Sequence, residues 1–168
     1  QSDSVDFGDL TSAMRGMASI SSSTRGVYAG GATPSKLNII QFVTIMTTGN
    51  TIDFGDLTVA KDFAAGGSNA TRGTIAGGRT PSQINSIDFV TIATLGNSID
   101  YGDLTVARGE FSGSSSKIES VMVGGSTGSV VNTIDFIAIA SGGNAQDFGD
   151  LISATYHASA TTNGHGGL

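Results

Sequence analysis

Apolar and β-branched residues are concentrated in one run that occurs three times along the chain: NIIQFVTIM from Asn38, NSIDFVTIA from Asn85 and NTIDFIAIA from Asn132. In the second run, Ile87, Phe89 and Val90 fall on several faces of a helix, so a single amphipathic helix does not explain them. Read with a period of two, Phe89 and Thr91 face one side while Val90 and Ile92 face the other. The pattern predicts a strand that is buried on both faces.

Turn-forming residues follow each of these runs. The runs are closed by Gly49-Asn50, Gly96-Asn97 and Gly143-Asn144. Both residue types tolerate positive φ, so the dipeptide predicts a tight turn. A second strand-like piece follows the turn, as in SIDYGDL, and shorter apolar pieces that end in paired glycine, RGVYAGG, RGTIAGG and ESVMVGG, precede the run. About four strands joined by short turns are therefore expected in each unit.

The units form a repeat with a period of 47 residues. DFGDL begins at Asp6, Asp53 and Asp147, and DYGDL begins at Asp100. Without gaps, the copies are residues 6–52, 53–99 and 100–146, with a partial copy at 147–168, in a single repeat domain 1–168. Four short strands at a period of about 40–50 residues are typical of a β-propeller. The predicted fold class is all-β, a propeller or part of one.

Composition narrows the possible functions. The 168 residues include 25 glycines, no cysteine and 13% charged residues, with a formal net charge of −6. This charge argues against a nucleic-acid partner, and the missing cysteines exclude disulfides and thiolate sites. No apolar run reaches the ~18–20 residues of a membrane span, so no membrane insertion is expected. The beginning QSDSVDFG lacks the basic and apolar parts of a signal peptide.

The order of motifs resembles the kelch repeat. Paired glycine closes one strand, an aromatic residue next to an acid marks the following strand, and a leucine with a basic residue comes last. The residues that carry this resemblance are Gly30-Gly31, Gly77-Gly78, Gly124-Gly125, Phe42, Phe89, Phe136, Leu57 with Lys61 and Leu104 with Arg108. The kelch tryptophan is absent, and the acids Asp88 and Asp135 precede the aromatic residue instead of following it. The resemblance implies a kelch-like propeller.

The repeat also resembles tandem IDFVTIATLGN and DFGDLT repeats in structural proteins of tailed bacteriophages, notably marine ones. That resemblance implies a non-enzymatic virion component, in the tail or exposed on the particle, with a virion or extracellular localisation. A rigid scaffold would present loops such as ATPSKLN and RTPSQIN to a host glycan, a receptor or another virion protein. Two alternatives are a calcium-dependent adhesion module and a propeller-based glycan-active enzyme.

The acids of the DFGDL motifs are the candidate metal ligands. Carboxylates on a turn suit calcium, although calcium loops usually supply four or five oxygen donors and each motif here supplies two acids. In the other interpretation, the motif is structural: the first aspartate accepts backbone N–H bonds and the glycine allows a bulge or positive φ. No cofactor is expected apart from possible calcium. The calcium candidates are Asp6, Asp9, Asp53, Asp56, Asp100, Asp103, Asp147 and Asp150.

Other motifs give no catalytic residue. DFG occurs in protein kinases, but no glycine-rich loop or catalytic loop accompanies it, and the glycine pairs lack the lysine of a phosphate loop. Close backbone approach between packed units explains those pairs. Arg25 and Arg72 are candidates for ligand contacts, ion pairs or solvated turns. The matching position of the third copy carries Glu119 instead of arginine. Tyr156, His157 and His165 form no nucleophile–base arrangement.

The repeat count predicts association. The sequence begins in the last strand of one unit and ends after the first strand of another, so both ends carry unfinished units with exposed edges. Other copies of the chain are the expected partners. A longer polypeptide, an irregular closure of a small propeller and a stacked open array are the alternatives.

Overall fold

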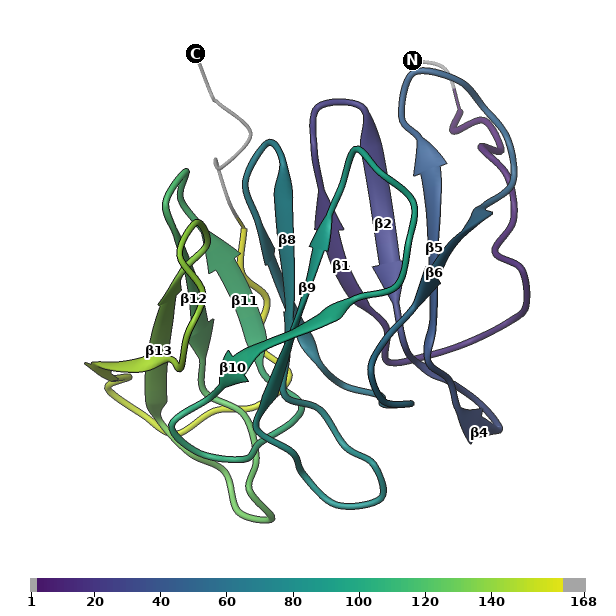
Figure 1. Cartoon of the computed structure of the whole chain (residues 1–168). Coiled ribbons are helices and arrows are strands. Elements are labelled where there is room, and N and C mark those ends of the chain that lie inside the picture. The colour runs from purple at the N-terminus through teal and green to yellow at the C-terminus, as the bar shows by residue number, and fades with distance from the viewer. Residues whose placement is uncertain (1–2, 162–168) are drawn as a thin grey trace.

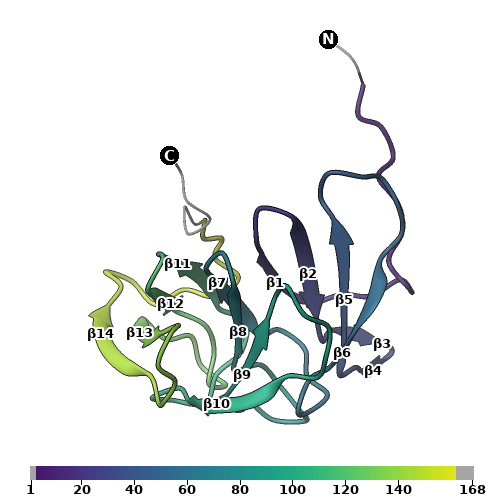
Figure 2. The ribbon, with the colours of Figure 1, turned by 45° about the horizontal axis from the view of Figure 1, so that its top comes forward.

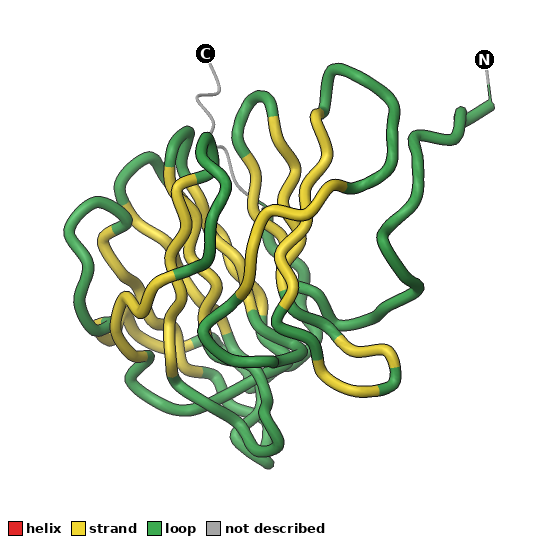
Figure 3. The backbone as a smooth tube through the Cα atoms, turned by 45° about the vertical axis from the view of Figure 1, so that its right-hand side comes forward, coloured by secondary structure: helices red, strands yellow, loops and turns green. Residues whose placement is uncertain are grey.

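The computed structural model describes residues 3–161 as strands and connecting loops (Figure 3). Within this range no helix is long and apolar enough to span a membrane. The strands form three four-stranded antiparallel sheets, which lie side by side (Figure 1). This confirms the all-β class and the four strands expected in each unit.

Each sheet is an antiparallel meander. Sheet 1 contains β1 (Ala18–Ser21), β2 (Arg25–Ala29), β5 (Ile39–Thr44) and β6 (Ile52–Asp56). Sheet 2 contains β7 (Ala65–Ser68), β8 (Arg72–Ala76), β9 (Ser86–Thr91) and β10 (Ile99–Asp103). Sheet 3 contains β11 (Ser112–Ser115), β12 (Glu119–Val123), β13 (Thr133–Ala138) and β14 (Gln146–Asp150). The repeat boundaries at Asp53 and Asp100 thus fall inside last strands, β6 and β10.

A small hairpin of β3 (Ala32–Thr33) and β4 (Ser35–Lys36) lies in the connection between β2 and β5. The matching connections of sheets 2 and 3 carry single bridges, Arg79 to Gln83 and Ser126 to Val130. All three connections follow a glycine pair. In each pair both glycines have positive φ, for example 58° at Gly77 and 104° at Gly78.

The first strands of the three sheets lie next to one another (Figure 2). Serines spaced by 47 residues link them: Ser68 Oγ donates to the Ser21 carbonyl at 2.9 Å, and Ser115 Oγ donates to the Ser68 carbonyl at 2.7 Å. A Cβ at Gly66 would overlap the Ser19 carbonyl oxygen. The small residues of AGGS are therefore required by the close approach of β1 and β7.

The hydrophobic core lies between sheets rather than inside one. One cluster of buried side chains joins sheets 1 and 2, and a second joins sheets 2 and 3. Sheet 2 contributes to both: Ile75 and Val90 belong to the first cluster, while Ala76 and Ile87 belong to the second. Adjacent residues of β8 point to opposite faces, so the predicted burial of both faces is confirmed for the central sheet.

The last strand of each sheet contains a bulge at its glycine. The pairing of third and fourth strands shifts register near Gly55, Gly102 and Gly149. These glycines have φ of 146°, 140° and 134°. The structural interpretation of the DFGDL glycine, a bulge with positive φ, is therefore confirmed in all three sheets.

The prediction of a tight turn at Gly-Asn was wrong. The connection between β9 and β10 spans residues 92–98, and Gly96 has positive φ while Asn97 does not. The loop is longer because it contacts the preceding sheet: Gly96 N donates to the Phe54 carbonyl and Ser98 N donates to the Asp56 carbonyl, both at 2.8 Å. These bonds cover the free edge of β6, which would otherwise be open to pairing.

Replacing Gly55 with alanine tests this close contact. A Cβ there would overlap the Gly96 carbonyl oxygen, whereas a Cβ at Gly149 would meet no atom within 4 Å. Both positions carry a similar positive φ, so the backbone strain of the substitution is matched. We expect Gly55→Ala to reduce the free energy of unfolding by about 1–3 kcal/mol more than Gly149→Ala, measured by chemical denaturation. Equal losses would show that the contact does not restrict this position.

Candidate functional site at the sheet junctions

A buried ion pair lies at each junction between sheets. Lys61 Nζ is 2.7 Å from Asp88 Oδ2, and Arg108 Nη1 is 2.8 Å from Asp135 Oδ2, with all four side chains 0% exposed. Each cation belongs to the linker that joins two sheets, and each acid belongs to the third strand of the next sheet. The bases of the leucine–base motif are thus paired with the two acids that depart from the kelch order.

Hydrogen bonds complete the surroundings of each acid. Asp88 Oδ1 accepts bonds from Thr58 Oγ1 and Ser98 Oγ, both at 2.6 Å, and from the Thr58 backbone N–H at 3.1 Å. Asp135 accepts from Thr105 Oγ1 at 2.6 Å. A buried carboxylate needs such donors because burial removes its hydration.

Burial and pairing change the pKa values of these groups. Burial lowers the pKa of Lys61, and the nearby Asp88 offsets part of this effect. For Asp88, burial acts to raise the pKa, but the charge of Lys61 and the hydrogen bonds from Lys61, Ser98 and Thr58 outweigh it, so the pKa lies below its ordinary value. Burial likewise lowers the pKa of Arg108. The geometry around Asp88 therefore holds its carboxylate in the ionised form.

An uncharged version of the same cluster lies where the N-terminal segment packs on sheet 1. Gln41 takes the position of Asp88, and Met14 takes the position of Lys61. Gln41 Oε1 accepts from Thr51 Oγ1 at 2.6 Å and from Thr11 N at 3.1 Å, and Gln41 Nε2 donates to Met14 Sδ at 3.2 Å. The fold thus accommodates either a charged or a neutral pair at this position.

The DFGDL aspartates take part in backbone structure. Asp6, Asp100 and Asp147 each accept the N–H of the glycine two residues later, at 3.0–3.3 Å. Among residues 3–161, no group of three or more acidic or histidine side chains is placed to hold a metal ion. The eight calcium candidates are therefore not brought together in groups of three or more within the described residues.

An asparagine side chain in each long loop makes a bond that the sequence analysis missed. Asn50, Asn97 and Asn144 use Oδ1 to accept the backbone N–H of Asp9, Asp56 and Asp103, respectively, at 2.9–3.1 Å. We call this repeated bond the asparagine clasp. Its signal in the sequence is the constant separation of 41 residues between aspartate and asparagine.

Arg25 and Arg72 also connect neighbouring sheets. Arg25 Nη1 donates to the Ile92 carbonyl at 2.7 Å, and Arg72 Nη1 donates to the Ala140 carbonyl at 2.6 Å. Each guanidinium also lies over a phenylalanine ring of its own sheet, as Arg25 does over Phe42 at 4.5 Å. The expectation of an ion pair or a solvated turn was wrong at both positions, because carbonyl oxygens of the next unit are the partners.

The residues of the partial fourth copy continue the packing of the third. The His157 backbone N–H donates to the Glu110 carbonyl at 2.8 Å, just as Glu110 N donates to Phe63 and Phe63 N to Gly16. The imidazole of His157 is half exposed, with Nε2 at 3.9 Å from Glu110 Oε2. His165 lies outside the described residues. His157 thus takes the structural position of Glu110 and Phe63, and its ring lies 4.8 Å from the ring of Tyr156.

A shallow cavity of about 380 Å³ follows the first strands of the three sheets. Its lining consists mainly of glycine and serine from these strands, together with Tyr28, Val43 and Ile45. Among the described residues that line it, hydroxyl and backbone groups are the polar groups that face the cavity.

No protein-family model and no curated protein matches the chain.

Exchanging the charged pair for the neutral one tests the role of the junction. Lys61→Met alone leaves Asp88 buried without its cation, and we expect a loss of about 3–5 kcal/mol in the free energy of unfolding. The double variant Lys61→Met/Asp88→Gln recreates the Met14–Gln41 pair, so most of that loss should be recovered. Denaturant unfolding compares the variants, with the exposed substitution Asp53→Asn as a control. A double variant as unstable as the single one would contradict the equivalence of the two pairs.

Proposed function

We propose that the chain is a non-enzymatic structural and binding component of a tailed-phage virion, in its tail or on its surface, built as a kelch-like propeller or part of one. The observation that carries the proposal is the repeated junction, in which glycine contacts, an asparagine clasp and a buried polar pair recur at constant spacing. Such a junction gives a stiff frame, which suits a structural role.

Three polar loops at one end of the sheets form the surface offered to a partner. They are residues 33–36, 80–83 and 127–130, which we call the display loops. Thr33, Pro81 and Ser129 at their tips are exposed. Neighbouring display loops approach each other, since Lys36 Nζ lies 3.4 Å from the Pro81 carbonyl.

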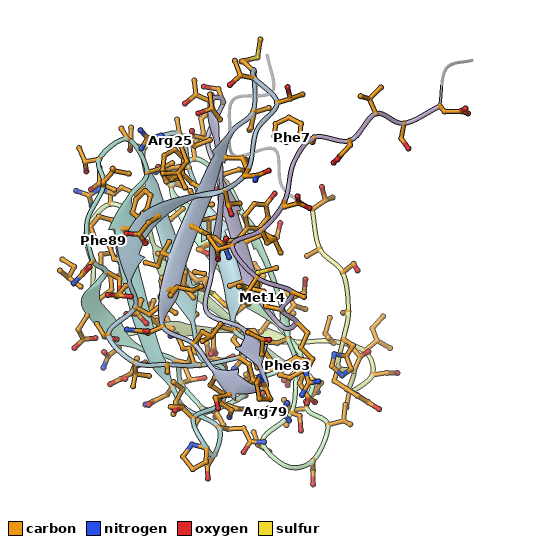
Figure 4. All side chains as sticks on the ribbon, turned by 90° about the vertical axis from the view of Figure 1, so that its right-hand side faces the viewer. Phe7, Met14, Arg25, Phe63, Arg79 and Phe89 are labelled. Carbon is orange, nitrogen blue, oxygen red and sulfur yellow. The ribbon has the colours of Figure 1, made fainter. Side chains whose placement is uncertain are left out.

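The bases of the display loops are held by charged side chains. Lys36 and Arg79 both approach Asp62, at 3.4 and 3.6 Å, and Arg79 pairs with Glu110 at 2.8 Å. Arg79 also covers the ring of Phe63 at 4.3 Å (Figure 4). Polar tips on a fixed base suit recognition of a glycan or a protein surface.

The virion assignment rests on the resemblance of the repeats to those of tailed-phage structural proteins. Immunogold electron microscopy of purified particles, from a phage whose genome encodes this chain, tests it. We expect gold label on the tail or on the particle surface, with particles that lack the coding sequence as the control. Recovery of the chain only from the soluble lysate would contradict the proposal.

Calcium removal separates this proposal from a calcium-dependent adhesion module. A site that binds calcium only in the folded state adds ~2.7 kcal/mol at 100 times its Kd, which corresponds to a rise in Tm of roughly 5–10 °C. We expect no such shift when a chelator replaces calcium in a thermal scan. A shift of that size, abolished by Asp53→Asn/Asp56→Asn, would favour the adhesion module.

A further inference from the structure

The same stretch of the repeat occurs at both ends of the described chain. Residues 6–16 read DFGDLTSAMRG, and residues 147–157 read DFGDLISATYH. In the middle of the chain, this stretch forms the last strand of one sheet and the linker to the next. Residues 53–63 are the example: they pair with β5 of sheet 1 and also contact the loop and the third strand of sheet 2.

At the N-terminal end, the stretch has only one of its two partners. Phe7 and Asp9 accept backbone bonds from Gly49 and Thr51, at 2.8 and 2.9 Å, and Asn50 forms the asparagine clasp with Asp9. Residues 6–10 form no strand, and they run along the outer side of sheet 1 (Figure 1). They therefore contact the loop between β5 and β6 of sheet 1 in the same way that β6 contacts the loop between β9 and β10 of sheet 2.

At the C-terminal end, the stretch has only the other partner, which is the sheet that precedes it in the sequence. Residues 146–150 pair with β13 as strand β14, but no described residue covers the outer side of that strand. Phe148 is 62% exposed, whereas the equivalent Phe54 is 3% exposed beneath the next unit. A Cβ at Gly149 would meet nothing within 4 Å, whereas one at Gly8, Gly55 or Gly102 would overlap a carbonyl of the adjoining loop.

We propose that the outer side of β14 binds sheet 1 of a second copy of this chain, in a head-to-tail contact in which residues 147–157 of one copy replace residues 6–16 of the other. The contact continues the two internal junctions. Asp150 N would meet Asn50 of the second copy in an asparagine clasp, and Tyr156 would take the place of Arg15, whose backbone bridges to Ala32. Residues 6–16 occupy the same surface of sheet 1 in their own molecule. They therefore act as an internal competitor of the incoming residues 147–157 and limit the length of the head-to-tail assembly.

The polar cluster of the new contact is compatible in charge. Sheet 1 carries the neutral Gln41 where sheets 2 and 3 carry Asp88 and Asp135, and the incoming linker carries Thr155 where the internal linkers carry Lys61 and Arg108. Contact between Gln41 and Thr155 leaves no charge buried without a partner. An acid at position 41 would face no cation in this arrangement.

Two residues make the contact between copies weaker than an internal junction. Glu119 stands where Arg25 and Arg72 donate to carbonyls of the next sheet, and it has no donor for the Ile45 carbonyl at the matching position. Ile152 stands where Thr58 donates a hydroxyl, so the bond to Gln41 is lost there. Reversible association is therefore expected rather than a permanent complex.

Matched glycine variants of the full chain test the proposal. Gly8→Ala/Arg15→Pro disturbs the competitor, because the new Cβ overlaps the Gly49 carbonyl and proline removes the bond from Arg15 N to the Ala32 carbonyl. Because the competitor lowers the fraction of binding-competent chains, we expect the apparent Kd for self-association to fall at least ~10-fold. Sedimentation velocity over a concentration series, relative to the 16.9 kDa monomer, measures the change.

Gly149→Ala, added to that variant, should reverse the gain. Its Cβ would meet the Gly49 carbonyl of the second copy but no described atom of its own chain within 4 Å. Gly128→Ala is the matched control, because Gly128 also has positive φ and open space and lies in a display loop. Glu119→Arg should strengthen association further. The proposal would be overturned if the Gly8→Ala/Arg15→Pro variant stays monomeric. It would also be overturned if adding Gly149→Ala leaves the association of that variant unchanged.

A cross-linking experiment needs no disturbance of the competitor. The chain contains no cysteine, so Gly49→Cys and Asp150→Cys can be made as separate full-length variants. Mixed at high concentration with a short thiol cross-linker, they should give a covalent dimer that neither variant gives alone. Absence of the mixed dimer would also overturn the proposal. This proposal rests on the junction geometry alone. If it fails, the virion assignment is unaffected and is still tested by immunogold microscopy.

Discussion

Close contact between neighbouring sheets is the constraint on which the rest of the structure depends. A four-stranded sheet of 4–6-residue strands has two apolar faces and cannot bury them alone. The sheets approach so closely that a Cβ at Gly66 would overlap the Ser19 carbonyl, and a Cβ at Gly55 would overlap the Gly96 carbonyl. Glycine at these points is thus a packing requirement, because larger residues there would separate the sheets and expose the clusters between them.

The buried polar clusters set the position of each linker. A linker must cross from the last strand of one sheet to the first strand of the next, and Lys61 or Arg108 fixes it by reaching an acid of the following sheet. A buried pair of this kind adds little net stability compared with an apolar pair, but a displaced linker would leave a charge unpaired. The position of the linker is therefore set by the free-energy cost of leaving a buried charge without its partner. The neutral pair Met14–Gln41 fills the same space without that penalty.

The buried junctions and the exposed display loops occupy different parts of the molecule. The junction residues are buried between sheets, while the display loops extend from one end and contribute little to the core. Changes at the loop tips would leave the junctions intact. Under the proposed function, the loops could vary in sequence while the frame stays the same.

The sequence by itself determined the all-β class, the four strands in each unit, the positive φ of the DFGDL glycine and the close approach at the glycine pairs. These features follow from local rules, since strand periodicity and the conformational freedom of glycine act within a few residues. The candidate site was recovered only in part. The sequence places Lys61 and Arg108 in the leucine–base motif, and it places Asp88 and Asp135 before the aromatic residue. Only the path of the linker pairs the bases with the acids.

Only the tertiary structure decided what the longer-range polar groups do. Asn97 was expected to form a turn, and it instead binds a backbone N–H 41 residues away. Arg25 was expected to meet an acid or water, and it instead reaches a carbonyl of the next sheet, 67 residues away. The partner of a long or polar side chain depends on which segments packing brings within about 3 Å, and no local pattern contains that information.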